Sequence, residues 1–577
     1  MHRYLFILLL CLGCWMPMAR AESAVEQWFE QLPAEAILIL DQAQSVPRTF
    51  FAGAESPEAL LPLHRLSDLL VSQAVLHALE AQQLSLDTPV NYHLGSDLRL
   101  LPPAGAPELT LHDLLTRAAG FPLRQSSLFV AKAQNIRSVS GFLAQALTPL
   151  PLASGRSISS DSLGDLVMAQ VFEQLTRQPL ETSLPAFALS QGLKLVPSDA
   201  KASPLPLTPA LYGYRLAPED MVRWLQLLQQ PQWQRQLLER HDSRAAGLPG
   251  SSRGLLSQPL PGGGNLFYLD SEWLGLTQRI GFLPAQKTAF YLAYRGQQPD
   301  LKRQLLELLL PPGSPQSVDC QLPTAASGYY RPLNLERRSI LAALNPFRQL
   351  QLDANGQWRP ARWGAVWQSA QGPVGCQIWQ LSADELVLRE PVDGFSHFVR
   401  SRWFETPGLQ LGLLAVFLLV FASMMLRGLH DLYLYEPQLP DLREAPADDV
   451  PDDLPEAEAT PRAGWDLPLL GTLGSSTALS SGLLIFPALL SMQRIGPHLS
   501  VAVRDQPSGW LVVALVLPLL SLIMGLILLA LLLTEWRSRP WNPYGGRYER
   551  LHYGVYLTAL LGWLIWLGQF RLLGFAL

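Results

Sequence analysis

The chain has 577 residues, too many for a single hydrophobic core, which predicts two or three domains. Hydrophobic residues make up 48% of the chain and the mean hydropathy is +0.13, values that indicate membrane segments beside any soluble part. The net charge is −5 and the chain has no basic stripe with interleaved aromatic residues. A nucleic acid is therefore excluded as the expected partner.

The first 21 residues have the pattern of a secretory signal peptide. Arg3 supplies a positive start, the apolar run YLFILLLCLGCW follows, and the small residues of ARA at 19–21 are typical of a cleavage site. We expect residues 1–21 to be removed and the rest of the chain to begin in an exported compartment.

Residues 22–312 mix strand and helix patterns. AILILDQAQ is typical of an early strand, and HRLSDLLVSQAVLHALEAQQLSLDTPV at 64–90 is typical of an amphipathic helix followed by a turn. KTAFYLAYRG predicts a late strand and DLKRQLLELLL a terminal amphipathic helix. This order predicts an α+β domain, in which helices flank an antiparallel sheet.

The segment LLPPGSPQSVDCQLP is rich in proline, glycine and serine and predicts a linker. Beyond it, runs such as FRQLQLDANGQWRPA and CQIWQLSADELVLRE alternate as strands do, so we expect a small all-β domain at 318–404. Without the signal peptide, Cys320 and Cys376 are the only cysteines. In an oxidising compartment they are expected to form a disulfide; two separate buried thiols are the alternative.

Four long apolar runs predict an α-helical transmembrane bundle, at residues 408–426, 467–492, 510–533 and 551–570. Four arginines in the loop between the last two runs mark that loop as cytoplasmic: Arg537, Arg539, Arg547 and Arg550. Everything before the first run then lies in the periplasm of a bacterium, outside its inner membrane. The loop at 427–466 is acidic and proline-rich, which predicts a disordered cytoplasmic loop that serves as a linker or docks a partner.

Five stretches in one order carry a resemblance to a known family. They are ALEAQQLSLDTPVNYHLG, LTLHDLLTRAAGFP, SSDSLGDLVMAQVFEQLTRQP, LAPEDMVRWLQLL and QRIGFLPAQKTAFYLAY. Residues from about 34 to 310 thereby resemble the serine β-lactamase and penicillin-binding protein superfamily, in its class C and DD-peptidase-like branch. The resemblance implies a β-lactamase/transpeptidase-like fold, often followed in this branch by a small β module and membrane helices.

The family's chemistry requires a serine and a lysine three residues apart at a helix start, where one turn places the ammonium beside the hydroxyl that it activates. Counting back from QLSLD without gaps, these two places hold Arg65 and Asp68. A guanidinium cannot attack a carbonyl, and an acid stands where the base should be. Starting instead from Ser67 puts Leu70 in the lysine place, and residues 61–75 contain no lysine. Arg65 and Asp68 are expected to pair with each other.

The family's other two motifs are also altered. The second, Tyr-x-Asn or Ser-Asp-Asn, aligns with Ser160-Asp161-Ser162, which keeps Ser-Asp and loses the asparagine. The third, Lys or His with Thr-Gly on the edge strand, aligns with Arg279-Ile280-Gly281, where a cation and the glycine are present but the threonine is not.

Two literal motif matches offer alternatives. Ser198-Asp199-Ala200-Lys201 is the only Ser-x-x-Lys, but its surroundings are proline-rich and no apolar helix follows. Residues 250–254 read Gly-Ser-Ser-Arg-Gly and match the Gly-x-Ser-x-Gly elbow, which needs a strand before it and a helix after it. We expect a loop at both places. The histidines show no paired ligand spacing, so neither a metal site nor a cofactor is predicted.

We therefore predict a pseudoenzyme anchored in the inner membrane, which binds an envelope ligand or an envelope protein partner. Its ligand-binding residues would be Arg65, Ser160 and Arg279, suited to a carboxylate such as that of a peptidoglycan-related peptide. The alternative is an active serine hydrolase of the peptidase, esterase or β-lactamase type with a remodelled site, using Ser67 or Ser160. A covalent reaction with a penicillin separates the two.

Overall fold

The structure is a computed structural model of the whole chain. The residues that it describes are 25–32, 35–42, 45–53, 59–95, 98–100, 107–121, 129–130, 136–146, 162–198, 205–206, 208–239, 250–260, 264–273, 275–296, 301–310, 327–332, 349–352, 358–360, 377–382, 385–390, 394–433, 472–480, 482–483, 509–538 and 546–569. The chain divides into two compact units. The first comprises Met1–Glu336, Phe347–Ser401 and Ile495–Gln506, and the second comprises Arg337–Pro346, Arg402–Arg494 and Pro507–Leu577.

A seven-stranded antiparallel sheet forms the centre of the first unit, with the order β2-β1-β12-β11-β10-β9-β8. Its strands are β1 (Ala36–Gln42), β2 (Arg48–Ala52), β8 (Gly250–Ser251), β9 (Leu256–Pro259), β10 (Asn265–Trp273), β11 (Leu276–Leu283) and β12 (Thr288–Arg295). The early strand β1 pairs with the late strand β12 from Ala36 opposite Tyr294 to Gln42 opposite Thr288. The predicted α+β fold with an antiparallel sheet is confirmed.

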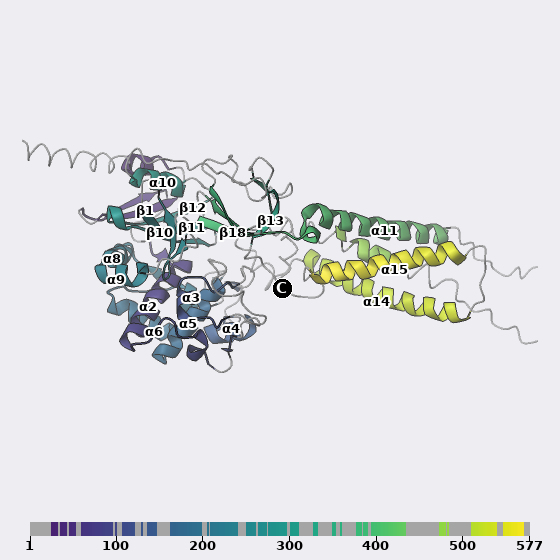
Figure 1. The fold of residues 1–577 in the computed structure, drawn as a ribbon, viewed down its shortest axis with the longest axis horizontal. Coiled ribbons are helices and arrows are strands. Elements are labelled where there is room, and N and C mark those ends of the chain that lie inside the picture. Colours follow the sequence, from purple (N-terminus) through teal and green to yellow (C-terminus); the bar gives the residue numbers. More distant parts are fainter. Residues whose placement is uncertain are drawn as a thin grey trace, which may run out of the picture. The chain divides into compact units, whose positions relative to one another are not determined.

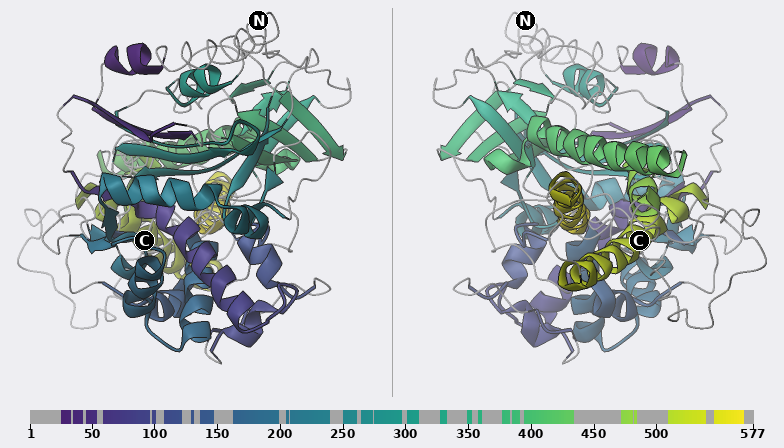
Figure 2. Two further views of the ribbon diagram at one scale, coloured as in Figure 1. Left: turned by 90° about the vertical axis from the view of Figure 1, so that its left-hand side faces the viewer. Right: turned by 90° about the vertical axis from the view of Figure 1, so that its right-hand side faces the viewer.

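Helices cover both faces of this sheet (Figures 1 and 2). One side carries α2 (Ser67–Ala81), α3 (Leu111–Leu115), α4 (Val139–Ala146), α5 (Ser162–Thr176), α6 (Leu180–Ser190), α7 (Pro209–Tyr212), α8 (Pro218–Gln229) and α9 (Pro231–Leu238). The other side carries α10 (Leu301–Leu309) and a helical turn at 25–30. Short strands complete this part: β3 (Leu61–Pro62), β5 (Val196–Pro197) and β7 (Tyr214–Leu216) form one sheet, and β4 (Phe129–Val130) and β6 (Leu205–Pro206) another.

The two layers explain why β1 is apolar without interruption. Ile37 and Ile39 belong to the core on the α2 side of the sheet, whereas Leu38 and Leu40 belong to the core on the α10 side. A strand with both faces covered has no solvent face and needs no polar alternation.

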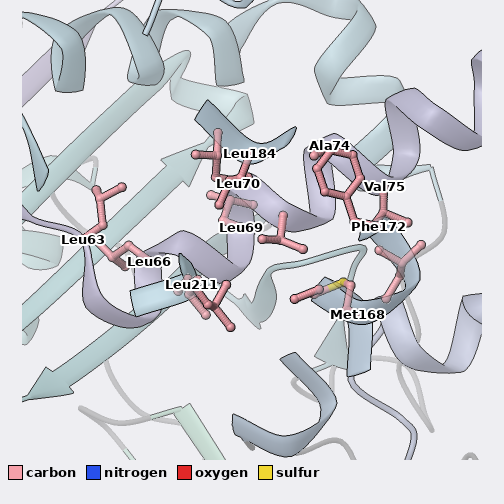
Figure 3. Packing of buried hydrophobic residues seen from close by; sticks show 14 of the residues in the cluster. Leu63, Leu66, Leu69, Leu70, Ala74, Val75, Met168, Phe172, Leu184 and Leu211 are labelled. Carbon is pink, nitrogen blue, oxygen red and sulfur yellow. The ribbon is translucent and has the colours of Figure 1, made fainter. Parts of the chain in front are cut away.

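Helix α2 is more deeply buried than its sequence predicts. Every residue from Ser67 to Leu76 is buried, so the expected amphipathic helix has no polar face over its first ten residues. Figure 3 shows its apolar side chains among those of α5, α6 and α7, with Leu70 near Leu184 and with Met168 and Phe172 close by. A helix surrounded on all sides is central to its domain. The polar residues of its first turn therefore lie inside the protein.

The motif at 250–254 forms a hairpin, not a nucleophile elbow. Strand β8 ends at Ser251, a turn follows, and β9 begins at Leu256, so a strand follows where the elbow needs a helix. Gly254 has a φ of +85°, and a Cβ built on it would lie 2.7 Å from the Cβ of Ser72 on α2. The hairpin thus approaches α2 at a point where only glycine fits.

Gly254→Ala is expected to destabilise the first unit by about 2 to 3 kcal/mol, because the left-handed backbone and the collision with Ser72 both oppose a methyl group. Gly275→Ala is the matched control. Gly275 has a φ of +77° with nothing within 4 Å of a built Cβ, so its loss should stay near 1 kcal/mol. Urea unfolding of the full chain in detergent measures both, and equal losses would contradict the close approach to α2.

A second, six-stranded antiparallel sheet also lies in the first unit, with the order β15-β14-β13-β18-β17-β16. Its strands are β13 (Gly328–Pro332), β14 (Leu350–Leu352), β15 (Trp358–Pro360), β16 (Gln377–Ser382), β17 (Glu385–Glu390) and β18 (Gly394–Arg400). The strands fall within the predicted all-β range, but a separate domain there stays a prediction. Cys320 and Cys376 lie outside the described residues, and so does the predicted signal peptide.

The second unit contains long apolar helices: α11 (Pro407–Tyr433), α14 (Gly509–Ser538) and α15 (Gly546–Gln569), with further helical residues at 472–480 and 482–483. Within the described residues, two helical stretches are long and apolar enough to cross a membrane, Pro407–Arg427 and Leu551–Gln569. In α14 the apolar stretch is shorter, Val516–Ala530.

Helices α11 and α15 run antiparallel to each other (Figure 1). The indole N–H of Trp566 donates to the Gln410 side chain at 2.6 Å, which joins the end of α15 to the start of α11. Further along α11, the ring of Phe421 lies 6.1 Å from that of Tyr556, which is earlier in α15. The two helices are therefore packed along their length.

Candidate functional site

Helix α2 begins where the alignment places the family's first motif. A 3-10 turn, η1 (His64–Leu66), leads directly into it. His64 has a φ of +46°, a backbone conformation that residues other than glycine rarely adopt. Its ring packs edge-on against Trp273 of β10, with ring centroids 5.0 Å apart. Burial lowers the pKa of His64 to about 4, so the imidazole is neutral at neutral pH. The chain is thus sharply bent immediately before Arg65.

Arg65 and Asp68 are part of a four-residue network of charges. Arg65 Nη2 lies 3.2 Å from Asp165 Oδ2, and Arg65 Nε lies 3.8 Å from Asp68 Oδ2. Arg117 Nη1 donates to Asp165 Oδ1 at 2.9 Å. Asp165 is on α5, and Arg117 follows α3 with a φ of +57°. The expected Arg65–Asp68 pair is present, but the shortest contacts of the network are those to Asp165.

The network lies inside the domain. The side chains of Asp68, Asp165 and Arg117 are 0%, 3% and 4% exposed, and that of Arg65 is 18% exposed. Burial lowers the pKa of Arg65, but the charges of Asp165 and Asp68 outweigh it, so the net pKa is raised and the guanidinium is charged. The expected pair of Arg65 and Asp68 is therefore present, and it is buried.

Asp68 is an acid of this network whose pKa is shifted upward. Burial raises the pKa of Asp68 well above its ordinary value, and the nearby charge of Asp165 raises it further, while Arg65 and Arg117 act in the opposite direction. Burial also raises the pKa of the neighbouring Tyr212 well above its ordinary value. The cluster thus contains two permanent cations, one carboxylate bonded to both of them, and one carboxyl group that favours the protonated form.

The fallback nucleophile Ser67 is the first residue of α2 and is fully buried. Among the described residues its Oγ has no hydrogen-bond partner. The residue one helical turn on is Leu70, which belongs to the hydrophobic core. Ser67 therefore has no solvent access, and no lysine follows it one helical turn on to activate its hydroxyl.

The second motif lies at the edge of what the structure describes. Ser160 and Asp161 are outside the described residues, and Ser162 is the first residue of α5, with a side chain that is not described. Asp165, which sequence reasoning missed, follows Ser162 by three residues and so lies one helical turn further on. A charged residue among the apolar residues of SLGDLVMAQVF is the signal that could have identified it.

Arg279 and Gly281 do not join this cluster, which corrects their expected place in the cleft. Their strand, β11, lies between β10 and β12 and is not an edge strand. The neighbouring Ile280 belongs to the core on the α2 side, so Arg279 points to the opposite face. There Arg279 Nε and Nη2 donate to the two oxygens of Asp270, each at 2.7 Å.

Lys302 of α10 completes that second network. Its ammonium lies 3.3 Å from Asp270 and 3.5 Å from Glu272, and its side chain is 1% exposed. Burial raises the pKa of Asp270, but Arg279 and Lys302 outweigh it and hold the pKa below its ordinary value. Arg279 therefore ties the sheet to α10 and is not placed to bind a ligand beside Arg65.

The remaining candidates lie elsewhere. Ser198 Oγ accepts a hydrogen bond from Arg215 Nε at 3.3 Å, and Lys201 is outside the described residues. In the part of the chain that the structure describes, no group of three or more histidine, cysteine, aspartate or glutamate side chains could hold a metal ion.

Comparisons with known proteins agree with this fold. Residues 69–309 match the family model described as Beta-lactamase. No curated protein matches the chain. Three solved structures similar to it are a D-stereospecific amidohydrolase from Streptomyces sp. (13% identity, 48% of this chain and 94% of that chain, TM-score 0.39), a penicillin binding protein from Bacillus halodurans (16%, 48% and 96%, 0.38) and a Beta-lactamase/D-alanine Carboxypeptidase from Yersinia pestis (16%, 48% and 93%, 0.39).

The matched residues span strands β8 to β12 of the seven-stranded sheet and the helices from α2 to α10, whereas β1 and β2 lie before the match. The match starts at Leu69, directly after Arg65 and Asp68. The α+β domain of this chain thus matches the Beta-lactamase family model, in agreement with the resemblance that its sequence carries.

Proposed function

We propose that the chain is a membrane-anchored pseudoenzyme of the bacterial cell envelope, which has lost serine acyl transfer and acts as a binding or scaffold module. The observation that carries the proposal is the buried network of Arg65, Asp68, Arg117 and Asp165 in the place of the family's serine and lysine.

Chemistry explains why this network cannot replace the serine and lysine. An acyl-transfer nucleophile needs a free electron pair, and a guanidinium that is always protonated has none to offer. The residue at the base position, Asp68, favours its protonated form, which donates a proton instead of accepting one. Ser67 is buried with Leu70 as its neighbour one turn on. Acyl transfer thus lacks both of its first two groups.

The helices of the second unit support anchoring in the inner membrane. Beyond the antiparallel α11 and α15, Thr477 Oγ1 and Ser521 Oγ lie 2.7 Å apart, and a Cβ on Gly474 would lie 3.3 Å from Met524. Thr477 thus faces Ser521, and Gly474, three residues earlier, faces Met524, three residues later. The segment near 477 therefore runs antiparallel to α14. Alternating directions are what four successive spans require.

The arginines between α14 and α15 favour a cytoplasmic loop there, with the β-lactamase-like domain in the periplasm after removal of residues 1–21. The ligand would be a carboxylate compound related to peptidoglycan, bound through Arg65, whose side chain is 18% exposed, and through Ser160. An envelope protein is the second kind of partner that such a module would serve.

A fluorescent penicillin tests the loss of chemistry. Membranes that carry the full chain are expected to give no covalent band on a denaturing gel, while muropeptides bind to the purified protein in calorimetry. A covalent band that disappears in Ser67→Ala or Ser160→Ala would refute the pseudoenzyme and support a hydrolase with a remodelled site. Asp220→Asn, in an exposed pair with Arg223, is the control for general effects of substitution.

A further inference from the structure

The charge network leaves polar atoms without partners. Among the described residues, no hydrogen bond reaches Nε or Nη2 of Arg117, Nε of Arg65, or either carboxyl oxygen of Asp68. Arg117 is 5% exposed and Asp68 is 0% exposed. A buried polar atom without a partner is costly, and the nitrogens of arginine can only donate. The network therefore requires a hydrogen-bond acceptor beside Arg117.

The geometry of Arg117 indicates the shape of that acceptor. Its Nη1 is taken by Asp165, which leaves Nε and Nη2, the two nitrogens along one edge of the guanidinium. Arg279 uses this same edge to hold both oxygens of Asp270. Such a fork fits the two oxygens of a carboxylate. The free edge of Arg117 is thus suited to a second carboxylate.

The charges of the network allow a carboxylate only under one condition. With Asp68 ionised, two arginines balance two aspartates and no further anion is needed. With Asp68 protonated, one positive charge is left over. An ionised Asp68 has no donor among the described residues, whereas a protonated Asp68 donates its O–H to Asp165. The proton and the anion therefore compensate each other.

We propose that Arg117 and Arg65 bind one small carboxylate, and that this anion binds when Asp68 carries a proton. Any proton taken up comes from solvent, and apart from the O–H of Asp68 no covalent bond forms or breaks. While Asp68 is protonated in the free protein, the anion balances the positive charge that is left over; at higher pH, where Asp68 is ionised, the anion and one proton bind together and the network stays neutral. Arg65 is its most exposed member, so the ligand enters beside Arg65.

This site deepens the proposed function, on which it rests, because it makes binding of a carboxylate ligand pH-dependent. The charged and titratable groups that face Asp68 are Arg65 of η1, Asp165 of α5, Arg117 after α3 and Tyr212 of α7. Burial raises the pKa of Tyr212, so its phenol stays neutral, and the two arginines stay charged. Asp68 is the group of this network whose charge depends on pH, so the pH at which it ionises sets the pH dependence of ligand binding.

Titration calorimetry with sodium acetate tests the proposal on the full chain in detergent micelles, at constant ionic strength in a sulfate background. Two buffers with different ionisation enthalpies report the protons taken up. We expect one acetate per chain, with no proton uptake at a pH where Asp68 is already protonated and with uptake that approaches one proton at a pH above its raised pKa. The affinity should fall by up to about tenfold per pH unit once Asp68 ionises in the free protein. Chloride should bind more weakly, because it cannot occupy both nitrogens of the fork.

Three variants sharpen the result. Asp68→Asn mimics the protonated acid and should bind acetate at every pH without proton uptake. Arg117→Lys keeps the charge but removes the fork, and should weaken acetate binding at least tenfold while changing chloride binding little. Asp220→Asn should behave as the wild type.

Acetate affinity and proton uptake that do not change with pH, or the same pH dependence in Asp68→Asn, would overturn the coupling. A folded wild-type protein that binds no acetate would overturn the site. Neither result bears on the pseudoenzyme, which the covalent penicillin band decides: a chain that stays unlabelled and binds muropeptides but no acetate contradicts this inference alone.

Discussion

Asp165→Asn is expected to destabilise the β-lactamase-like domain by about 3 to 5 kcal/mol, because it removes the only carboxylate bonded to both arginines of a buried network. Arg117 is 4% exposed on its side chain, and Asp165 is its one ion-pair partner among the described residues. An asparagine has the same shape but no charge to offset the two guanidinium groups. Urea unfolding of the full chain in detergent, followed by tryptophan fluorescence, measures the loss.

Asp68→Asn is the matched control, because Asp68 is the other aspartate of the same network. Because the pKa of Asp68 is raised, the native state holds a proton that the unfolded chain releases above its ordinary value of 3.8. The stability that this proton adds to the native state is fully present below the ordinary pKa of 3.8. It is lost as the pH rises through the raised pKa of the folded protein. The variant lacks this dependence, so its stability relative to wild type should increase as the pH rises above the ordinary value of 3.8 towards the raised pKa. Equal losses in the two variants would show that the two acids have the same role.

Asp270→Asn is the second change with a large expected effect, a loss of about 3 kcal/mol. It removes the carboxylate that Arg279 holds with two hydrogen bonds and that Lys302 of α10 shares. Since the cations hold the pKa of Asp270 low, its contribution is present above the ordinary value of 3.8 and is lost as the pH falls through the lower value. Thermal unfolding at pH 7 should show the loss.

Glu272→Gln serves as the control for Asp270. Glu272 is 65% exposed and lies 3.5 Å from the same Lys302, so its removal should change the unfolding free energy by about 0.5 kcal/mol or less. Hydrogen exchange of α10 should rise in Asp270→Asn and stay unchanged in Glu272→Gln. If the two variants unfold alike, the buried fork with Arg279 does not hold α10 to the sheet.

The sequence predicts the framework of the domain well. The apolar runs at β1 and β12, the helix at α2 and the terminal helix α10 are strong local patterns, and the structure has all four in the predicted places. The packing of the helices against one another determines which polar residues are buried, and the local sequence patterns do not predict this. The helix α2 reads as amphipathic, yet helices α5, α6 and α7 surround it, so Gln73 and Ser72 are buried as well.

The site could be predicted only in part, because its contacts are distant in sequence. Arg65 and Asp68 are one helical turn apart and their pair follows from spacing. Asp165 comes from a helix 100 residues further along the chain, and Arg117 lies 48 residues before it. The place of Arg279 could not be predicted for another reason. In a strand, neighbouring side chains point to opposite faces, so the alignment of Gly281 with the family's glycine did not determine which face of the sheet Arg279 occupies.

The contacts of Asp165 with two arginines also constrain which residues positions 65 and 68 can hold. A serine at 65 and a lysine at 68 would place an ammonium near Asp165, and an ion pair between them would keep the ammonium protonated and unable to accept a hydroxyl proton. Removing Asp165 as well would leave the buried Arg117 without its carboxylate partner. An engineered serine and lysine in this domain therefore require coordinated substitutions at 65, 68, 117 and 165.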